Sequence, residues 1–239
     1  MRTSSLLLSL ISITSLAVTA AGCKGKPKHQ DPPVAVAKGS AGGGSSKDPA
    51  PTALPHSDGS LPVKLPKPID GSKFAAIEAM KFDGFKVDTH AKTADMLEVR
   101  QKTEDHPRIW ATINMHACHD DCWPMELAKW KEHEPTIKKL LPEVLQKAPD
   151  TVWELGSTQL NGATMIYSYQ LGQHIDPQEG GSYTHAYTLY YNDGINAISV
   201  VAEYKDDWMA DKEAMAKSVP REDLEHVATA FMDVYTHAW

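Results

Sequence analysis

The chain has only three cysteines in 239 residues, and no apolar run beyond residue 22 approaches the ~18 residues that a membrane-spanning helix needs. All 18 of its Phe, Trp and Tyr residues lie after residue 66. It contains no phosphate-binding glycine loop, no Gly-x-Ser-x-Gly turn and no EF-hand calcium loop. These absences argue against a transmembrane protein, a P-loop nucleotide hydrolase, an α/β-hydrolase and a calcium sensor.

The first 22 residues have the pattern of an export signal. Arg2 precedes an uncharged stretch, Leu6–Val18, whose 13 residues are too few to span a bilayer. Small residues at positions 20–22 then lead to Cys23. This order resembles the lipobox of bacterial lipoproteins, which implies cleavage before Cys23 and acylation of its thiol, although lipoboxes usually carry leucine where this chain has Ala20. An ordinary secretory signal with an incidental cysteine is the alternative.

The cysteine count agrees with lipidation. Three cysteines leave an exported protein with one unpaired thiol, and acylation of Cys23 would remove it. Cys118 and Cys122 then remain as a pair in an oxidising compartment. In lipoproteins of well-studied diderm bacteria an aspartate after the acylated cysteine favours retention at the inner membrane. Lys24 stands here, so the resemblance implies the outer membrane, facing the periplasm or the cell surface.

Residues 23–66 are predicted to form a disordered tether. Eight of the 16 prolines lie between residues 24 and 66, together with glycines and serines, and such a segment buries too little apolar surface to fold. Residues 1–66 carry a net charge of +4 and residues 67–239 a net charge of −11, which together give −7. An acidic domain argues against nucleic acid as a partner. The membrane, reached through the lipid, is the expected partner.

Residues 67–239 are predicted to form a single α+β domain. Apolar residues alternate through most segments, and Asn161-Gly162 and Asn192-Asp193-Gly194 mark turns between them. We expect a central, mostly antiparallel sheet with a mid-chain helix and a C-terminal helix packed on it. The predicted strands are 82–87, 95–101, 108–115, 151–155, 163–171, 183–191 and 195–204, a polar loop covers 172–182, and the predicted helices are 125–146, restarted at Pro135, then 206–217 and 220–235.

This order of elements resembles the PsbP-like α/β/α sandwich found in small exported or lipid-anchored bacterial proteins. The resemblance rests on element order over residues 82–239 and on no diagnostic motif. It implies a binding or assembly module for a protein or small-molecule ligand rather than an enzyme, so no catalytic residue and no cofactor is assigned. Six tyrosines, at 167, 169, 183, 187, 190 and 191, either line a carbohydrate or peptide groove or pack the sheet.

Residues 116–124 form the densest cluster of reactive side chains. The sequence favours a disulfide between Cys118 and Cys122 that staples a strand to a helix. Alternatively, His116, Cys118, His119 and Cys122 hold copper or zinc, with His174 or His185 as a distant ligand. The Cys-x3-Cys spacing resembles Sco-type copper chaperones, although Trp123 here precedes the proline and the βαβ pattern is missing. A thiol–disulfide exchanger is the third reading, but such enzymes favour Cys-x2-Cys.

Overall fold

The computed structural model describes the domain and a short segment before it. The described residues are 54–59, 62–65, 67–68, 77, 80, 82, 84–92, 96–103, 109–119, 122–139, 141, 143–148, 150–176, 180–204 and 212–237. The strands are β1 (Phe85–Lys92), β2 (Met96–Thr103), β3 (Ile109–Ala117), β4 (Val152–Leu160), β5 (Ala163–Asp176), β6 (Gly180–Asn192) and β7 (Asn196–Tyr204). The helices are α2 (Leu127–Lys138), α3 (Glu143–Lys147), α4 (Lys212–Ser218) and α5 (Arg221–His237).

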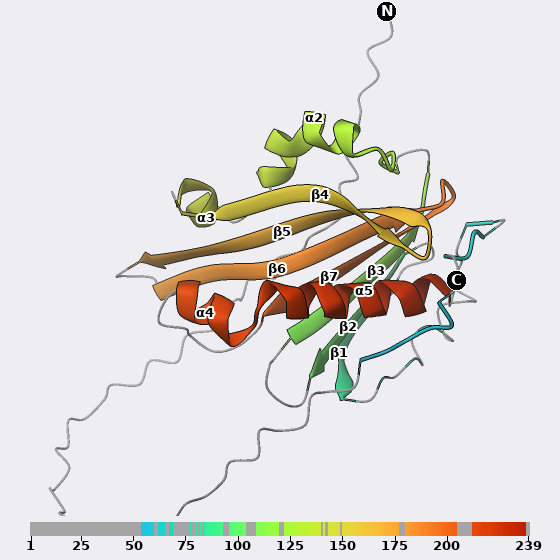
Figure 1. Ribbon diagram of the computed structural model, residues 1–239, viewed down its shortest axis with the longest axis horizontal. Coiled ribbons are helices and arrows are strands. Elements are labelled where there is room, and N and C mark those ends of the chain that lie inside the picture. Colours follow the sequence, from blue (N-terminus) through green and yellow to red (C-terminus); the bar gives the residue numbers. More distant parts are fainter. Residues whose placement is uncertain are drawn as a thin grey trace, which may run out of the picture.

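All seven strands join one antiparallel sheet in the order β1-β2-β3-β7-β6-β5-β4. The chain runs from the edge strand β1 inward to β3, crosses through α2 and α3 to the opposite edge, and returns inward through β4 to β7, which pairs with β3 (Figure 1). Strands β1 and β4 are therefore the two edges of the sheet. The prediction of an antiparallel sheet with helices is confirmed, and the sheet is the dominant part of the fold.

The alternation of side chains along the strands divides the apolar residues between the two faces of the sheet. Met165, Leu189 and Val200 belong to the main core under α5, whose own buried stripe includes Leu224, Val227 and Phe231. Ile166, Tyr190 and Ala197 of the same three strands face the other way and pack in a second cluster with residues of α2. The sheet thus lies between α5 on one face and α2 on the other.

Two predicted segments differ from the structure. The expected polar loop at 172–182 is largely strand, because pairing between β5 and β6 continues out to Asp176 and Gly180. Polarity does not prevent pairing there, since the main chain supplies the ladder bonds. The expected helical region is two helices, and Pro135 lies inside α2 instead of restarting it. Of the helix expected at 206–217, the described part is α4 from Lys212.

Part of the segment that the sequence analysis assigned to the tether packs against the domain. We call residues 54–59 and 62–65 the N-terminal strap. Leu65 is 5% exposed within the main core, and its N–H donates to Asp193 Oδ2 at 2.9 Å. Leu54 contacts the same core, and the Ser57 hydroxyl donates to Asp233 on α5. Ordered chain therefore precedes the predicted boundary at residue 66.

The export signal and Cys23 lie outside the described residues. In the part of the chain that the structure describes, no helix has the length and apolar character needed to cross a membrane.

Candidate binding site

The cysteine loop follows β3 directly. Cys118 and Cys122 form a disulfide with their Cα atoms 5.2 Å apart. The N–H of Cys118 donates to the Ile195 carbonyl at 2.8 Å, and the Trp123 carbonyl accepts from Asn192 Nδ2 at 2.6 Å. Both ends of the loop are therefore bonded to the turn between β6 and β7.

The same loop holds α2 to the sheet through tilted and edge-on contacts between aromatic rings. The Trp123 ring lies 5.1 Å from that of Trp130 and 4.9 Å from that of His133. Trp130 in turn lies 4.9 Å from Tyr190, and its indole N–H donates to the Pro124 carbonyl at 2.7 Å. These contacts give the cysteine loop a structural role.

The four residues of the metal hypothesis do not assemble as ligands. The disulfide occupies both cysteine sulfurs, His116 is half-buried and His119 is exposed. Among the described residues, no three His, Cys, Asp or Glu side chains gather so that they could hold a metal ion. Asp120 and Asp121 lie outside those residues.

The tyrosines whose side chains the structure describes divide between the two faces of the sheet, so they do not share one groove. Tyr167, Tyr169 and Tyr187 surround the Arg221 guanidinium, whose central carbon lies 4.6 to 6.0 Å from their ring centroids. Arg221 also forms two bonds to Glu154, of 2.6 and 3.0 Å. That guanidinium and the Tyr167 hydroxyl lower the pKa of the Glu154 carboxyl to about 2. The cluster therefore holds the first turn of α5 to the sheet.

His185, one suggested distant ligand, lies inside the core. It is 1% exposed, its Nε2 lies 3.3 Å from the Tyr169 hydroxyl, and its Nδ1 has no partner among the described residues. Burial lowers the pKa of its imidazole to about 4, so the ring is neutral at pH 7. The side chain of His174, the other suggested ligand, lies outside the described part.

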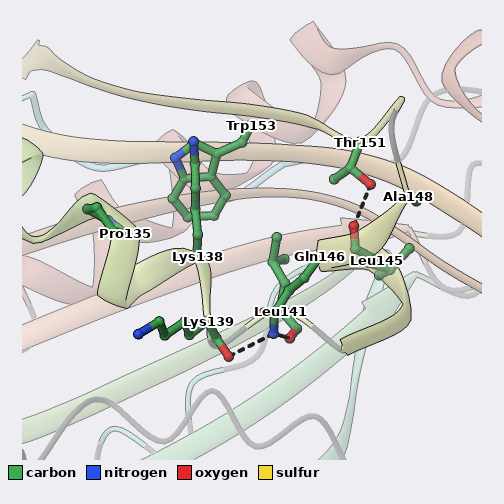
Figure 2. Close-up of a pocket in the computed structure, with 9 residues that line it drawn as sticks. All are labelled: Pro135, Lys138, Lys139, Leu141, Leu145, Gln146, Ala148, Thr151 and Trp153. Carbon is green, nitrogen blue, oxygen red and sulfur yellow. Dashed lines mark hydrogen bonds between the residues drawn. The ribbon is translucent and has the colours of Figure 1, made fainter.

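An open pocket of about 310 Å³ lies between α2, α3 and the start of β4 (Figure 2). Leu141 and Leu145 are buried and form its floor, whereas Lys138, Lys139 and Gln146 are exposed at its mouth. Its lining consists of Pro135, Lys138, Lys139, Leu141, Leu145, Gln146, Ala148, Thr151 and Trp153.

Side-chain bonds to the main chain fix the walls of this pocket. The Gln146 amide donates to the carbonyls of Lys139 and Leu141, at 3.0 and 2.5 Å. The Thr151 hydroxyl donates to the Leu145 carbonyl at 2.8 Å. These bonds satisfy carbonyls that the short helices leave free, so α3 and the turns beside it are held in place.

Two lysines give the pocket a positive mouth on an acidic domain. Lys138 Nζ lies 5.9 Å from the Trp153 ring centroid and 2.9 Å from Glu134 Oε1. Lys139 is exposed, and no described carboxylate pairs with it. Anionic groups are therefore favoured at this opening.

The Trp153 indole N–H is buried and has no acceptor among the described residues. Leaving a buried donor without a partner costs about 1–3 kcal/mol. A ligand that brought an oxygen acceptor to this N–H would remove that cost. The pocket is thus lined by Trp153 with its unused donor, by Lys138, which is paired with Glu134, by Lys139, and by the apolar Leu141 and Leu145.

Comparison of the chain with protein-family models, curated proteins and solved structures finds no match. The lipobox and PsbP-like resemblances therefore remain predictions. Function is inferred here from the geometry and chemistry of the pocket.

Sequence reasoning missed this pocket. Lys138-Lys139 and Trp153 stand in segments predicted as helix and strand, and nothing in the local pattern sets them side by side. The signal available was an adjacent pair of lysines in an acidic domain, followed by a tryptophan at a strand start. Their proximity follows from the crossover, which brings α2 beside the edge strand β4 and α3 beside β5.

Proposed function

We propose that this chain is a lipid-anchored protein of the cell envelope whose globular domain binds a ligand in the pocket between α2, α3 and β4. The observation that carries the binding role is the buried, unpartnered N–H of Trp153 in a pocket with Lys138 and Lys139 at its mouth. The lipobox-like segment ending at Cys23 supports the anchor, and helices on both faces of the sheet agree with the PsbP-like resemblance.

The chemistry of the pocket defines the class of ligand. The indole N–H and the two ammonium groups are donors, so they fit a carboxylate or another anionic acceptor. Leu141, Leu145 and the face of Trp153 fit an apolar or flat group attached to that anion. These groups orient a ligand, and they do not include a nucleophile paired with a base, so binding is proposed rather than catalysis.

The test uses small probes and the purified full-length protein. Benzoate and hexanoate are titrated while the Trp153 indole resonance is followed by NMR, with Trp153→Phe used to assign that resonance among six tryptophans. We expect dissociation constants of about 0.1–1 mM and at least about tenfold weaker binding of benzyl alcohol and hexanol, which lack the charge.

Charge variants locate the site. Lys138→Glu with Lys139→Glu is expected to weaken benzoate binding about tenfold or more. Lys129→Glu with Lys131→Glu makes the same change of charge on exposed positions of the same helix and is expected to leave binding unchanged. An indole resonance that stays fixed with both carboxylates, or equal losses in both double variants, would contradict the proposed site.

A further inference from the structure

We infer that the ligand of this pocket is the C-terminal end of an extended peptide, which adds as a new strand to the edge of β4 and places its terminal carboxylate between α2, α3 and Trp153. The inference rests on the proposed function and names its ligand class. Three features of the described residues lead to it: the free hydrogen-bonding groups of β4, the lack of protection along that edge, and the charge at one end of it.

The outer side of β4 offers a row of main-chain donors and acceptors. Asn161 and Gly162, with φ of 51° and 84°, make a two-residue turn that pairs Leu160 with Ala163. The two residues that flank such a turn form hydrogen bonds with each other, and hydrogen-bonded pairs then recur at every second residue along the strand. The residues of β4 between these pairs direct their main-chain N–H and C=O groups away from β5. These are Trp153, Leu155, Ser157 and Gln159, and in the described part of the chain no other main-chain group bonds to them.

The two edges of the sheet differ in their protection. Sheet edges are commonly guarded by lysine, proline or a bulge that prevents another strand from pairing. Strand β1 carries Lys86 and Lys92 and an irregular register between Val87 and Thr89. Strand β4 pairs regularly over all nine residues, contains no proline or lysine, and has one charged residue, Glu154, which Arg221 neutralises. This edge therefore carries none of the three guards named above, which favours strand addition.

The pocket lies at one end of that edge, which sets the direction of the added strand. Thr151 and Trp153, at the start of β4, line the pocket, while Ser157 and Gln159 further along are exposed. A peptide antiparallel to β4 ends beside Trp153, and a parallel one begins there. Because Lys138 and Lys139 attract a carboxylate and repel an amino terminus, the antiparallel direction is favoured.

The same geometry defines the side chain that the last peptide residue should carry. With its carboxylate at the indole N–H and the lysines, the side chain of that residue faces Leu141 and Leu145. An apolar final residue therefore fits the floor, and residues beside Ser157 and Gln159 meet solvent, so their identity matters less. The ligand class is a peptide with an extended C-terminus and an apolar last residue.

The test is an NMR titration of the full-length protein with two peptide pools. The first is an equimolar pool of heptapeptides Thr-Val-Thr-Val-Thr-Thr-Z, where Z is Val, Leu, Ile or Phe with a free carboxylate, and the second is the same pool amidated at the C-terminus. We expect the acid pool to shift the amide resonances of Trp153, Leu155, Ser157 and Gln159, to displace benzoate, and to bind at least about tenfold more tightly than the amidated pool.

A main-chain variant tests strand addition itself. Ser157→Pro removes one outward N–H and leaves the hydrogen bonds to β5 intact, so it is expected to weaken binding of the acid pool about tenfold. Ser157→Ala keeps this N–H and is expected to keep the binding. Should Ser157→Pro fail to fold, N-methylation of single peptide amides replaces it. Methyl groups on the amides facing β4 should abolish binding, and those on alternate amides should not.

The outcomes separate this inference from the proposed function. Benzoate binding without any peptide-induced shift along β4 overturns the inference and leaves the pocket as a small-anion site. Equal binding of acid and amidated pools overturns the placement of the carboxylate. Absence of binding by benzoate and by both pools overturns the inference and the proposed function together.

Discussion

His185 is a titratable side chain enclosed by the core, so folding sets its charge. Burial lowers the pKa of its imidazole from 6.5 to about 4. Between these values the unfolded chain binds a proton that the folded chain does not, so stability falls as the pH falls from about 6.5 to about 4. Over that window the residue should lower the free energy of unfolding by at most about 3 kcal/mol, measured by urea unfolding at pH 7 and pH 4.

His185→Leu is expected to remove this part of the pH dependence and to cost about 1–3 kcal/mol at pH 7, because the buried Tyr169 hydroxyl loses its contact with Nε2. His226→Gln, at an exposed position of α5, is the matched control and should keep the dependence of the unaltered protein. Identical pH profiles for His185→Leu and the unaltered protein would show that the ring is not held neutral by burial.

The pair formed by Glu154 and Arg221 gives a prediction of the same sign in pH, in a more acidic window. The neighbouring guanidinium lowers the pKa of Glu154 from 4.5 to about 2, so its contribution is present above pH 4.5 and is lost as the pH falls through about 2. Because Glu154 is 41% exposed, solvent screening limits the loss in Glu154→Gln to about 1 kcal/mol at pH 7. Urea unfolding should show that the difference in free energy of unfolding between the unaltered protein and Glu154→Gln is smaller at pH 3 than at pH 7. An equal difference at both pH values would contradict the ion pair.

At the scale of elements, the disulfide closes a very short loop between β3 and α2. Cys118 and Cys122 are four residues apart, and the chain-entropy relation gives about 2 kcal/mol for a loop of that size. The double change Cys118→Ser and Cys122→Ser should lower the free energy of unfolding by about that amount. A reductant should bring the unaltered protein to the same value. Both thiols found free, by mass spectrometry of alkylated, unreduced protein, would contradict the bond.

Elements whose pattern is local were predicted well from the sequence. Helix α5 has its apolar stripe and its proline at the start, and the Asn161-Gly162 turn joins two strands of clear alternation, so each is determined by neighbouring residues. The expected loop at 172–182 was wrong because strand length there depends on pairing between β5 and β6. Pairing across a sheet leaves little trace in a single polar segment.

The candidate site was predicted less well, for a related reason. The disulfide follows from counting cysteines, yet the Arg221 cluster joins residues 67 positions apart, from Glu154 on β4 to the start of α5. The pocket likewise depends on how the crossover helices meet β4. Such contacts are set by topology, and composition alone did not bring Lys138, Lys139 and Trp153 together.

For the whole molecule, the N-terminal strap changes where the stable unit begins. Leu65 is buried in the main core, so Leu65→Ala should lower the free energy of unfolding by about 2–4 kcal/mol. A chain that starts at Lys67 should be less stable than one that starts at Leu54 by at least the same amount. Val63→Ala is the control, because Val63 is 36% exposed, and its effect should stay within about 0.5 kcal/mol. Equal thermal stability of the two truncated chains would contradict a structural role for the strap.

Anchoring is the last prediction, and it concerns where the whole molecule is held. If Cys23 carries the lipid, Cys23→Ala removes the acylation site, and the protein should move from the membrane fraction to the soluble fraction of the cell envelope. One acyl chain alone holds a protein only marginally, so the unaltered protein should carry more than one and resist extraction by salt. Fractionation with radioactive palmitate measures both properties. Cys118→Ser keeps the first cysteine and should stay on the membrane with its label. The apolar stretch before Cys23 is too short to span a bilayer and cannot replace the lipid as an anchor. If the Cys23→Ala protein stays on the membrane without a palmitate label, the domain itself must hold it there, and the lipoprotein assignment would be wrong.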